Sequence, residues 1–246
     1  MKNNQSSVLK SISLYLIAII VAVAAQPLHS EWLISKVSQN TLFVRSFKNA
    51  PRQGSATAFE IKASSGKVYT VTNAHVCGLA NSNKEILIQD KLGSGRLIPI
   101  KILEVFPDND LCILEGLANY DGLDIASSSA IGDQVYALGY PYGEALNYSF
   151  GRIKDFNTIE MYNDEVSPEE CNGSRFRINN HPFYGPVCLE SFKSVATDLI
   201  IHPGNSGSAM VNIYGNVVGV IFASNQRTHW GHAVPLDHLT TLLKAY

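Results

Sequence analysis

The chain has 246 residues, of which 46% are hydrophobic and 16% are charged. This composition excludes an intrinsically disordered chain and is sufficient for a sizeable hydrophobic core. The formal net charge is −2, and the lack of a basic surplus argues against nucleic acid as a partner.

The first 25 residues have the pattern of a secretory signal peptide. Lys2 and Lys10 precede the apolar stretch Ile12–Ala25, which ends in small residues suited to cleavage. The stretch has 14 residues, which is short for a membrane span. We therefore expect a secreted or periplasmic protein after removal of residues 1–25. The alternative is an uncleaved segment that anchors the chain to a membrane.

Two predicted strands carry a histidine and a carboxylate at their ends. The β-branched run Val68–Thr72 predicts a strand that leads to His75 at the edge of a cleft. The apolar run Leu111–Leu114 predicts a second strand, and Asp110 precedes it directly. Asp110 is therefore favoured over Asp108 as the partner of the imidazole. Because a lone histidine is more often structural, its role depends on the rest of the chain.

The run G-N-S-G at residues 204–207 suits a nucleophilic serine. Gly204 and Gly207 leave the backbone free to adopt a turn in which successive N–H groups converge in front of Ser206. Such a group of donors is an oxyanion hole, and its candidate donors are Gly204, Asn205 and Ser206. A serine becomes a nucleophile when an imidazole takes its proton and a carboxylate orients that imidazole. Taken alone, the run could also be a polar turn between two strands.

Three motifs occur in the order histidine, aspartate, serine. They are V-T-N-A-H-V around His75, D-L-C-I-L from Asp110 and G-N-S-G-S-A around Ser206. They resemble the motifs of trypsin-like (chymotrypsin-fold) serine proteases, most closely the bacterial HtrA/Deg-like and glutamyl-endopeptidase-like branches. Further stretches similar to strands of that family are Gly54–Phe59, with Ala56 where glycine is usual, Leu138–Gly143 and Gly231–Pro235. The resemblance covers the chain from about residue 40 to its end.

The resemblance implies an all-β fold of two six-stranded antiparallel β-barrels with the active site in the cleft between them. On this basis residues 26–246 form one protease domain, with the first barrel at about 36–125 and the second at about 126–234. A terminal helix is expected at 235–245, where apolar residues at 236, 239, 242 and 243 have helical spacing. No PDZ domain is expected after it.

The resemblance also implies a serine endopeptidase that cleaves protein or peptide substrates through an acyl-enzyme. His75 is then the general base and general acid, Asp110 orients the imidazole, and Ser206 is the nucleophile. No cofactor is expected, and no metal ion, because the chain lacks C-x-x-C and H-x-x-x-H spacing. The alternative is a catalytically silent binding or regulatory protein on the same scaffold. The oligomeric state stays open.

In this family the pocket for the side chain before the cleaved bond is lined by the segment upstream of the serine and by the strands that follow. The corresponding residues here are Ile200, Ile201, Ile221, Phe222 and His232. Ile200 stands six residues before Ser206, where trypsin-type enzymes place an aspartate, and Ile221 stands where glutamyl endopeptidases carry a histidine. We therefore expect cleavage after small or medium aliphatic residues. The alternative is cleavage after glutamate, with His232 binding the carboxylate.

Export to an oxidising compartment favours disulfides among the four cysteines. Cys171 and Cys188 bracket a loop of low periodicity, and we expect a disulfide to close it. Cys77 and Cys112 follow the candidate histidine and aspartate by two residues each. If those two residues meet, this pair forms either a second disulfide or two free cysteines packed as small apolar residues.

Overall fold

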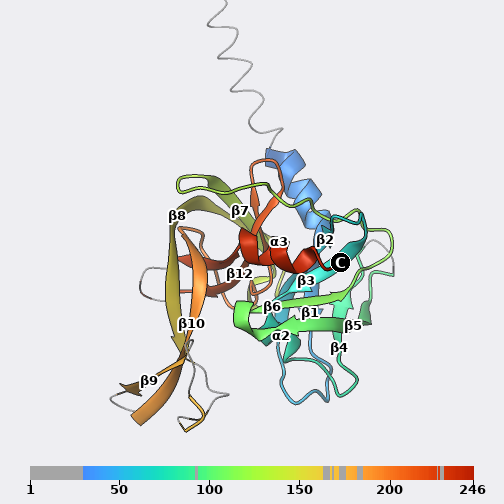
Figure 1. The fold of residues 1–246 in the computed structure, drawn as a ribbon. Coiled ribbons are helices and arrows are strands. Elements are labelled where there is room, and N and C mark those ends of the chain that lie inside the picture. Colours follow the sequence, from blue (N-terminus) through green and yellow to red (C-terminus); the bar gives the residue numbers. More distant parts are fainter. Residues whose placement is uncertain are drawn as a thin grey trace, which may run out of the picture.

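The computed structural model describes residues 30–91, 94–162, 167, 169–171, 176–181, 185–225, 227 and 230–246. The expected signal peptide, residues 1–25, lies outside this part of the chain. Two bodies of antiparallel strands lie side by side, and the C-terminal helix lies at their junction (Figure 1). Within the described ranges, no helix is both long enough and apolar enough to cross a membrane.

The first body is a closed barrel of six strands in the order β1-β2-β3-β6-β5-β4. Its strands are β1 (Thr41–Arg45), β2 (Ser55–Lys62), β3 (Val68–Thr72), β4 (Glu85–Gln89), β5 (Leu97–Phe106) and β6 (Leu111–Glu115). Alternate side chains of these strands fill the barrel, where Leu42, Ile86 and Leu114 are buried. β2 is buried on both faces, because Ala58 packs inside the barrel and Phe59 packs against the second body.

The second body is a sheet of seven strands in the order β13-β12-β11-β7-β8-β10-β9. Its strands are β7 (Gln134–Gly139), β8 (Asn147–Tyr162), β9 (Phe176–His181), β10 (Gly185–Thr197), β11 (Ala209–Asn212), β12 (Val217–Ser224) and β13 (Gly231–Pro235). β10 also pairs with β13, so six strands close on themselves and β9 continues along the edge of β10. The expected all-β fold of two antiparallel barrels is thus confirmed, with β9 as an addition.

Two helices pack on the junction of the two bodies. The C-terminal helix α3 (Leu236–Leu243) buries Leu239 and Leu243, within the 235–245 expected for it. A helix over residues 30–40 buries Leu33 and Val37 in the same core cluster. The first barrel therefore starts at Thr41 rather than near residue 36, because the apolar side chains at 33, 34 and 37 share one face of a helix.

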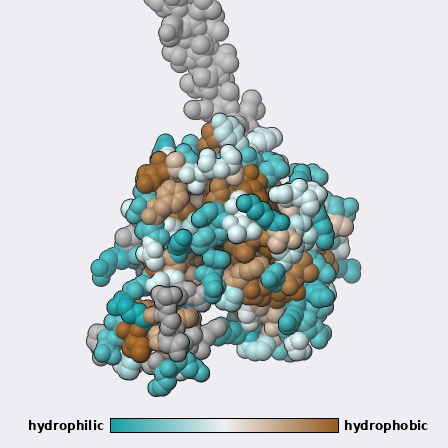
Figure 2. All heavy atoms as spheres, in the orientation of Figure 1, coloured by the Kyte–Doolittle hydropathy of each residue, from teal (hydrophilic) through white to brown (hydrophobic). Residues whose placement is uncertain are grey.

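β8 and β10 are the longest described strands, and their outer parts leave the body as a ribbon that β9 widens (Figure 1). This ribbon stands clear of the first barrel at its outer end (Figure 2). An ion pair between Arg177 of β9 and Glu160 of β8 spans the ribbon across β10. Side-chain contacts therefore stabilise the ribbon in addition to the backbone hydrogen bonds between its strands.

Two disulfides are present, and both expected cysteine pairs form them. Cys171 is bonded to Cys188 of β10, with their Cα atoms 5.6 Å apart. Cys77 is bonded to Cys112 of β6, with their Cα atoms 6.5 Å apart. For Cys77 and Cys112 the sequence left open a disulfide or two free cysteines, and the structure has the disulfide. The two residues meet because the short helix α2 (Ala74–Cys77) lies against the start of β6.

Candidate active site

His75 and Asp110 meet because β3 and β6 are neighbours in the first barrel. Thr72, the last residue of β3, pairs with Cys112 near the start of β6. α2 follows β3 almost directly and carries His75, while the short helix η1 (Pro107–Asn109) leads to Asp110 just before β6. The strand pairing therefore delivers both side chains to the same end of the barrel.

Asp110 is held in one orientation by the backbone around the histidine. Its φ of +47° is left-handed, a conformation that aspartate tolerates better than most residues. Its Oδ1 accepts a hydrogen bond from the backbone N–H of His75 at 3.0 Å, and its carbonyl oxygen accepts one from Asn73 Nδ2 at 3.0 Å. Its side chain is only 10% exposed, so solvent ions screen its charge weakly.

The imidazole of His75 is bound to this carboxylate through one nitrogen. Nδ1 lies 2.9 Å from Asp110 Oδ2 and 3.1 Å from Oδ1. Because a carboxylate accepts hydrogen bonds, it selects the tautomer with the proton on Nδ1 and leaves Nε2 as an acceptor. The histidine side chain is 49% exposed, so the ring is accessible from the cleft.

Ser206 lies on a tight turn that precedes β11. Gly204 and Gly207 have φ values of +96° and +85°, which strain any residue with a side chain. A Cβ at Gly204 would lie 2.3 Å from the carbonyl oxygen of Tyr140, and one at Gly207 would lie 2.0 Å from that of Thr57. Both glycines are required, by backbone conformation and by space.

Two N–H groups of this turn are available to bind an anion. The N–H groups of Gly204 and Ser206 donate to no acceptor in the described part of the chain. The N–H of Asn205 donates to the carbonyl oxygen of His202 at 3.0 Å. Asn205 therefore differs from its expected role as a third donor, because the turn itself uses its N–H group.

The orientation of the Gly204 N–H is fixed from the short helix η2 (Pro141–Gly143). The carbonyl oxygen of Pro203 accepts a hydrogen bond from the N–H of Tyr142 at 2.6 Å. Because the peptide unit is planar and trans, the Gly204 N–H points the opposite way. The Tyr142 ring also stacks on His202, with centroids 5.3 Å apart, and its hydroxyl lies 3.2 Å from Nδ1 of that imidazole.

Ser206 and His75 come from different bodies and are connected across the junction. The N–H of Thr57 on β2 donates to the carbonyl oxygen of Ser206 at 2.9 Å, and the hydroxyl of Thr72 donates to the carbonyl oxygen of Thr57 at 2.7 Å. No hydrogen bond joins Ser206 Oγ to the imidazole of His75 in this structure. In free enzymes that contact is often long, and it tightens in the substrate complex.

The residues expected to line a specificity pocket occupy different environments. Ile200 is 62% exposed and lines a cavity of about 520 Å³ beside the serine turn. Ile201 is buried against Gly231, where a Cβ would lie 2.5 Å from its Cγ1. Ile221 and Phe222 are buried in the packing of β12. Of the expected residues, Ile200 and Ile201 line this cavity, together with polar residues that include Asp198 and His202.

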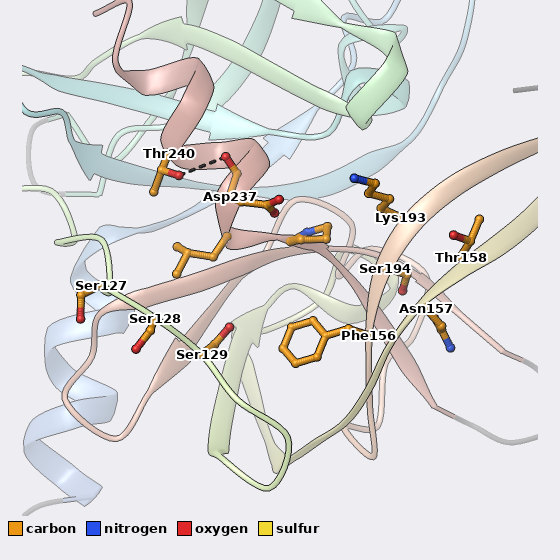
Figure 3. Close-up of a pocket in the computed structure, with 12 residues that line it drawn as sticks. Ser127, Ser128, Ser129, Phe156, Asn157, Thr158, Lys193, Ser194, Asp237 and Thr240 are labelled. Atoms are coloured by element: carbon orange, nitrogen blue, oxygen red, sulfur yellow. Dashed lines mark hydrogen bonds between the residues drawn. The ribbon is translucent and has the colours of Figure 1, made fainter. Parts of the chain in front are cut away.

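His232 differs from the expectation that it lines this pocket. Successive side chains of a strand point to opposite faces, so His232 projects away from the face on which Gly231 meets Ile201. Its Nδ1 lies 2.8 Å from Ser194 Oγ of β10, and burial lowers the pKa of the imidazole. Ser194 lines a separate cavity of about 620 Å³, beside Lys193 and between the ribbon and α3 (Figure 3).

Sequence patterns do not single out three residues that position the site, namely Thr57, Asn73 and Tyr142. Two of them lie inside stretches that resemble family strands, Gly54–Phe59 and Leu138–Gly143, and this was the available signal. Their hydrogen bonds depend on how closely the two bodies approach, which no local pattern reports.

The sequence model of the trypsin-like peptidase domain matches residues 56–220, and the chain belongs to this family. The serine protease Do-like HtrA of Lactococcus lactis is 29% identical over 163 residues, which are 65% of this chain and 34% of that protein. The periplasmic serine endoprotease DegP of Salmonella typhimurium is 26% identical over 74% of this chain and 34% of its own length. The chain thus spans about a third of the length of these relatives.

Solved structures show the same fold. The active form of the Rv3671c protease from M. tuberculosis matches with a TM-score of 0.62 and 18% identity, over 86% of this chain and 82% of that one. The HtrA-type protease AlgW with a tripeptide matches with a TM-score of 0.62 and 20% identity, over 87% of this chain and 62% of that one.

Proposed function

We propose that this chain is a secreted serine endopeptidase that acts through the triad of Ser206, His75 and Asp110. One observation carries the proposal. An imidazole held through Nδ1 by a buried carboxylate is combined with a serine turn whose Gly204 and Ser206 N–H groups are unused. Membership of the trypsin-like peptidase family supports it.

In the proposed reaction Ser206 Oγ attacks the carbonyl carbon of the scissile peptide bond, and its proton passes to His75 Nε2. Asp110 stabilises the resulting imidazolium, and the N–H groups of Gly204 and Ser206 bind the oxyanion that forms. Collapse of this intermediate expels the amine, which takes the proton from the imidazolium, and leaves an acyl-enzyme. Water then attacks the acyl group with the same proton transfers and releases the acid.

The proposed substrates carry a small or medium aliphatic residue before the cleaved bond. Ile200 and Ile201 offer aliphatic surface, and Asp198, which lines the same cavity, is already paired with Lys154. The charged end of a lysine, arginine or glutamate buried there would lack a partner and cost several kcal/mol. His232 is directed at Ser194 and is therefore not placed to neutralise a glutamate.

The proposed location is the periplasm or the exterior of the cell. The signal-like segment at residues 1–25 supports export. The two disulfides support it independently, because such bonds persist in oxidising compartments. The Salmonella relative DegP is itself described as periplasmic.

A fluorophosphonate probe tests the proposal without a known substrate, because it reacts only with an activated serine. The wild-type chain should be labelled, and Ser206→Ala should not. Ser128→Ala removes an exposed serine ahead of β7 and serves as the matched control, which should be labelled like the wild type. Labelling of Ser206→Ala would contradict the choice of nucleophile. An unlabelled wild-type chain would favour the catalytically silent alternative.

A peptide-library profile tests the specificity. We expect cleavage after valine, alanine or leucine, and a profile unchanged in His232→Ala. A profile dominated by glutamate and lost in His232→Ala would reverse the aliphatic assignment.

A further inference from the structure

Thr57 is a fully buried polar residue at the junction of the two bodies. It lies on β2 of the first barrel. Its hydroxyl donates a hydrogen bond to the carbonyl oxygen of Gly204 at 2.8 Å and accepts one from the N–H of Tyr140 at 3.0 Å. A buried hydroxyl is costly unless it is paired, and here it acts both as donor and as acceptor. Both partners belong to the second body.

The backbone of Thr57 holds the same turn. Its N–H donates to the carbonyl oxygen of Ser206, so one residue fixes two carbonyls of the serine turn, at Gly204 and at Ser206. Its own carbonyl oxygen accepts the hydroxyl of Thr72, which ends the strand leading to His75. Thr57 therefore connects the serine turn to β3, the strand that leads to His75.

Two glycines of the second body allow Thr57 to lie close to the serine turn. A Cβ at Gly139 would lie 2.9 Å from Thr57 Oγ1, and a Cβ at Gly207 would lie 2.0 Å from the Thr57 carbonyl oxygen. Any larger residue at either position would push Thr57 away from the turn. Gly207 is also required by its backbone conformation, with a φ of +85°.

We propose that Thr57 is a positioning residue for the oxyanion hole, which it maintains by fixing the carbonyl of Gly204. Glycine has the widest choice of backbone conformations, so the left-handed Gly204 keeps its orientation only where a neighbour restrains it. When the hydroxyl is lost, the Gly204 carbonyl loses its donor and the buried Tyr140 N–H loses its acceptor. Tyr140 leads into η2, whose Tyr142 orients the Pro203 carbonyl, so the peptide units on both sides of Gly204 loosen together.

This inference rests on the proposed function, and the variants Thr57→Val and Thr57→Ser test it. Valine keeps the shape and removes the hydroxyl, whereas serine keeps the hydroxyl and removes a methyl group. We expect the rate of labelling by a fluorophosphonate to fall by about 10- to 100-fold in Thr57→Val, somewhat less than the loss of a whole oxyanion donor. Thr57→Ser should stay within about threefold of the wild type.

With a cleaved peptide from the library profile, the loss in Thr57→Val should appear in kcat, with KM nearly unchanged. The oxyanion is absent from the bound substrate and develops only in the transition state and the tetrahedral intermediate, so a structural role alone would not produce this division. The pH profile should keep its wild-type midpoint, because His75 and Asp110 are untouched. Urea unfolding identifies the conditions under which each variant is folded, and rates are compared only there. Thr57→Ala is a second variant without the hydroxyl and should show the same loss if the valine does not fold.

If Thr57→Val or Thr57→Ala is folded and is labelled at the wild-type rate, the inference about Thr57 is overturned and the proposed function stands. The same holds if Thr57→Ser is folded and is labelled as slowly as Thr57→Val. A wild-type chain that is not labelled would overturn the proposed function and this inference with it. Slow labelling without the hydroxyl, rescued by serine, supports it.

Discussion

At the scale of single residues, Asp110 is placed to act on the proposed reaction through His75 without touching the substrate. It accepts hydrogen bonds from both the ring and the backbone N–H of His75, so it fixes the position and the tautomer of the imidazole together. Asp108 lies two residues before it on η1, whereas Nδ1 of the His75 ring is bound to Asp110. The two acids can therefore be distinguished by their effects on rate.

We expect Asp110→Asn to lower kcat by about 10⁴-fold, because an amide in place of the carboxylate favours the wrong tautomer of His75. Asp108→Asn should leave kcat nearly unchanged. Steady-state kinetics on one peptide substrate, with circular dichroism to verify folding, makes the comparison. A larger loss in Asp108→Asn would move the assignment to that residue.

Glu60 is a second acid with an unusual environment, far from the solvent and inside the fold. Its side chain is fully buried on β2, and Oε1 accepts hydrogen bonds from the Thr70 hydroxyl at 2.6 Å and from the Leu117 N–H at 3.2 Å. Oε2 has no hydrogen-bond partner among the residues that the structure describes. Burial outweighs these hydrogen bonds and raises the pKa of Glu60 from the usual 4.5 to about 7.

A raised carboxyl pKa makes the folded chain bind more protons than the unfolded chain between pH 4.5 and about 7. The contribution of Glu60 to stability is therefore fully present below pH 4.5 and is lost as the pH rises through about 7. We expect Glu60→Gln to remove this pH dependence of stability. Between pH 5 and pH 9, the free energy of unfolding of the variant should rise by up to about 3 kcal/mol relative to that of the wild type. Urea unfolding of both proteins at pH 5 and pH 9 measures this difference. If the free energy of unfolding fell equally with pH in the wild type and in Glu60→Gln, the role of Glu60 would be refuted.

At the scale of elements, the disulfide Cys171–Cys188 acts on the ribbon of β8, β9 and β10. It closes a short loop whose ends are 17 residues apart in sequence. Replacing both cysteines by serine should lower the free energy of unfolding by up to about 3 kcal/mol, because the unfolded chain regains the freedom of that loop. The segment between them should also be cut sooner in limited proteolysis. An unchanged unfolding midpoint would show that the ribbon does not depend on the bond.

The elements that carry a local sequence motif could be predicted from the sequence. The features that are set by pairing with another strand could not. The strand before His75 follows from a β-branched run, the strand after Asp110 from an apolar run, and the turn of Ser206 from glycine spacing. The strand β9 could not be predicted, because it depends on pairing along the edge of β10. The direction of His232 depends on the register of β13 with β10, and a shift of one residue would reverse it.

At the scale of the whole molecule, one core cluster joins the two bodies. It includes Phe59 and Val71 from the first barrel, Val220 from the second sheet, Leu239 from α3 and Leu33 from the helix at residues 30–40. The cleft lies between bodies that share this core. Rigidity of the site therefore depends on packing well away from it.

Leu33→Ala should lower the free energy of unfolding by about 2 to 5 kcal/mol, because it leaves a cavity at a fully buried position. Since the cluster is shared, both bodies should still unfold in one transition. Far-ultraviolet circular dichroism and tryptophan fluorescence during urea unfolding measure this. Transitions with separate midpoints would show that the bodies unfold independently.

The hydrogen bond between Thr57 and Gly204 joins residues 147 positions apart in the chain. Contacts of such long sequence separation are slow to form, since the loop between them must close first. Because the turn of Ser206 takes its support from β2, the nucleophile is not held in place until the two bodies have met. Under the proposed function, a newly made molecule therefore gains the capacity to cut other chains only at the end of its own folding.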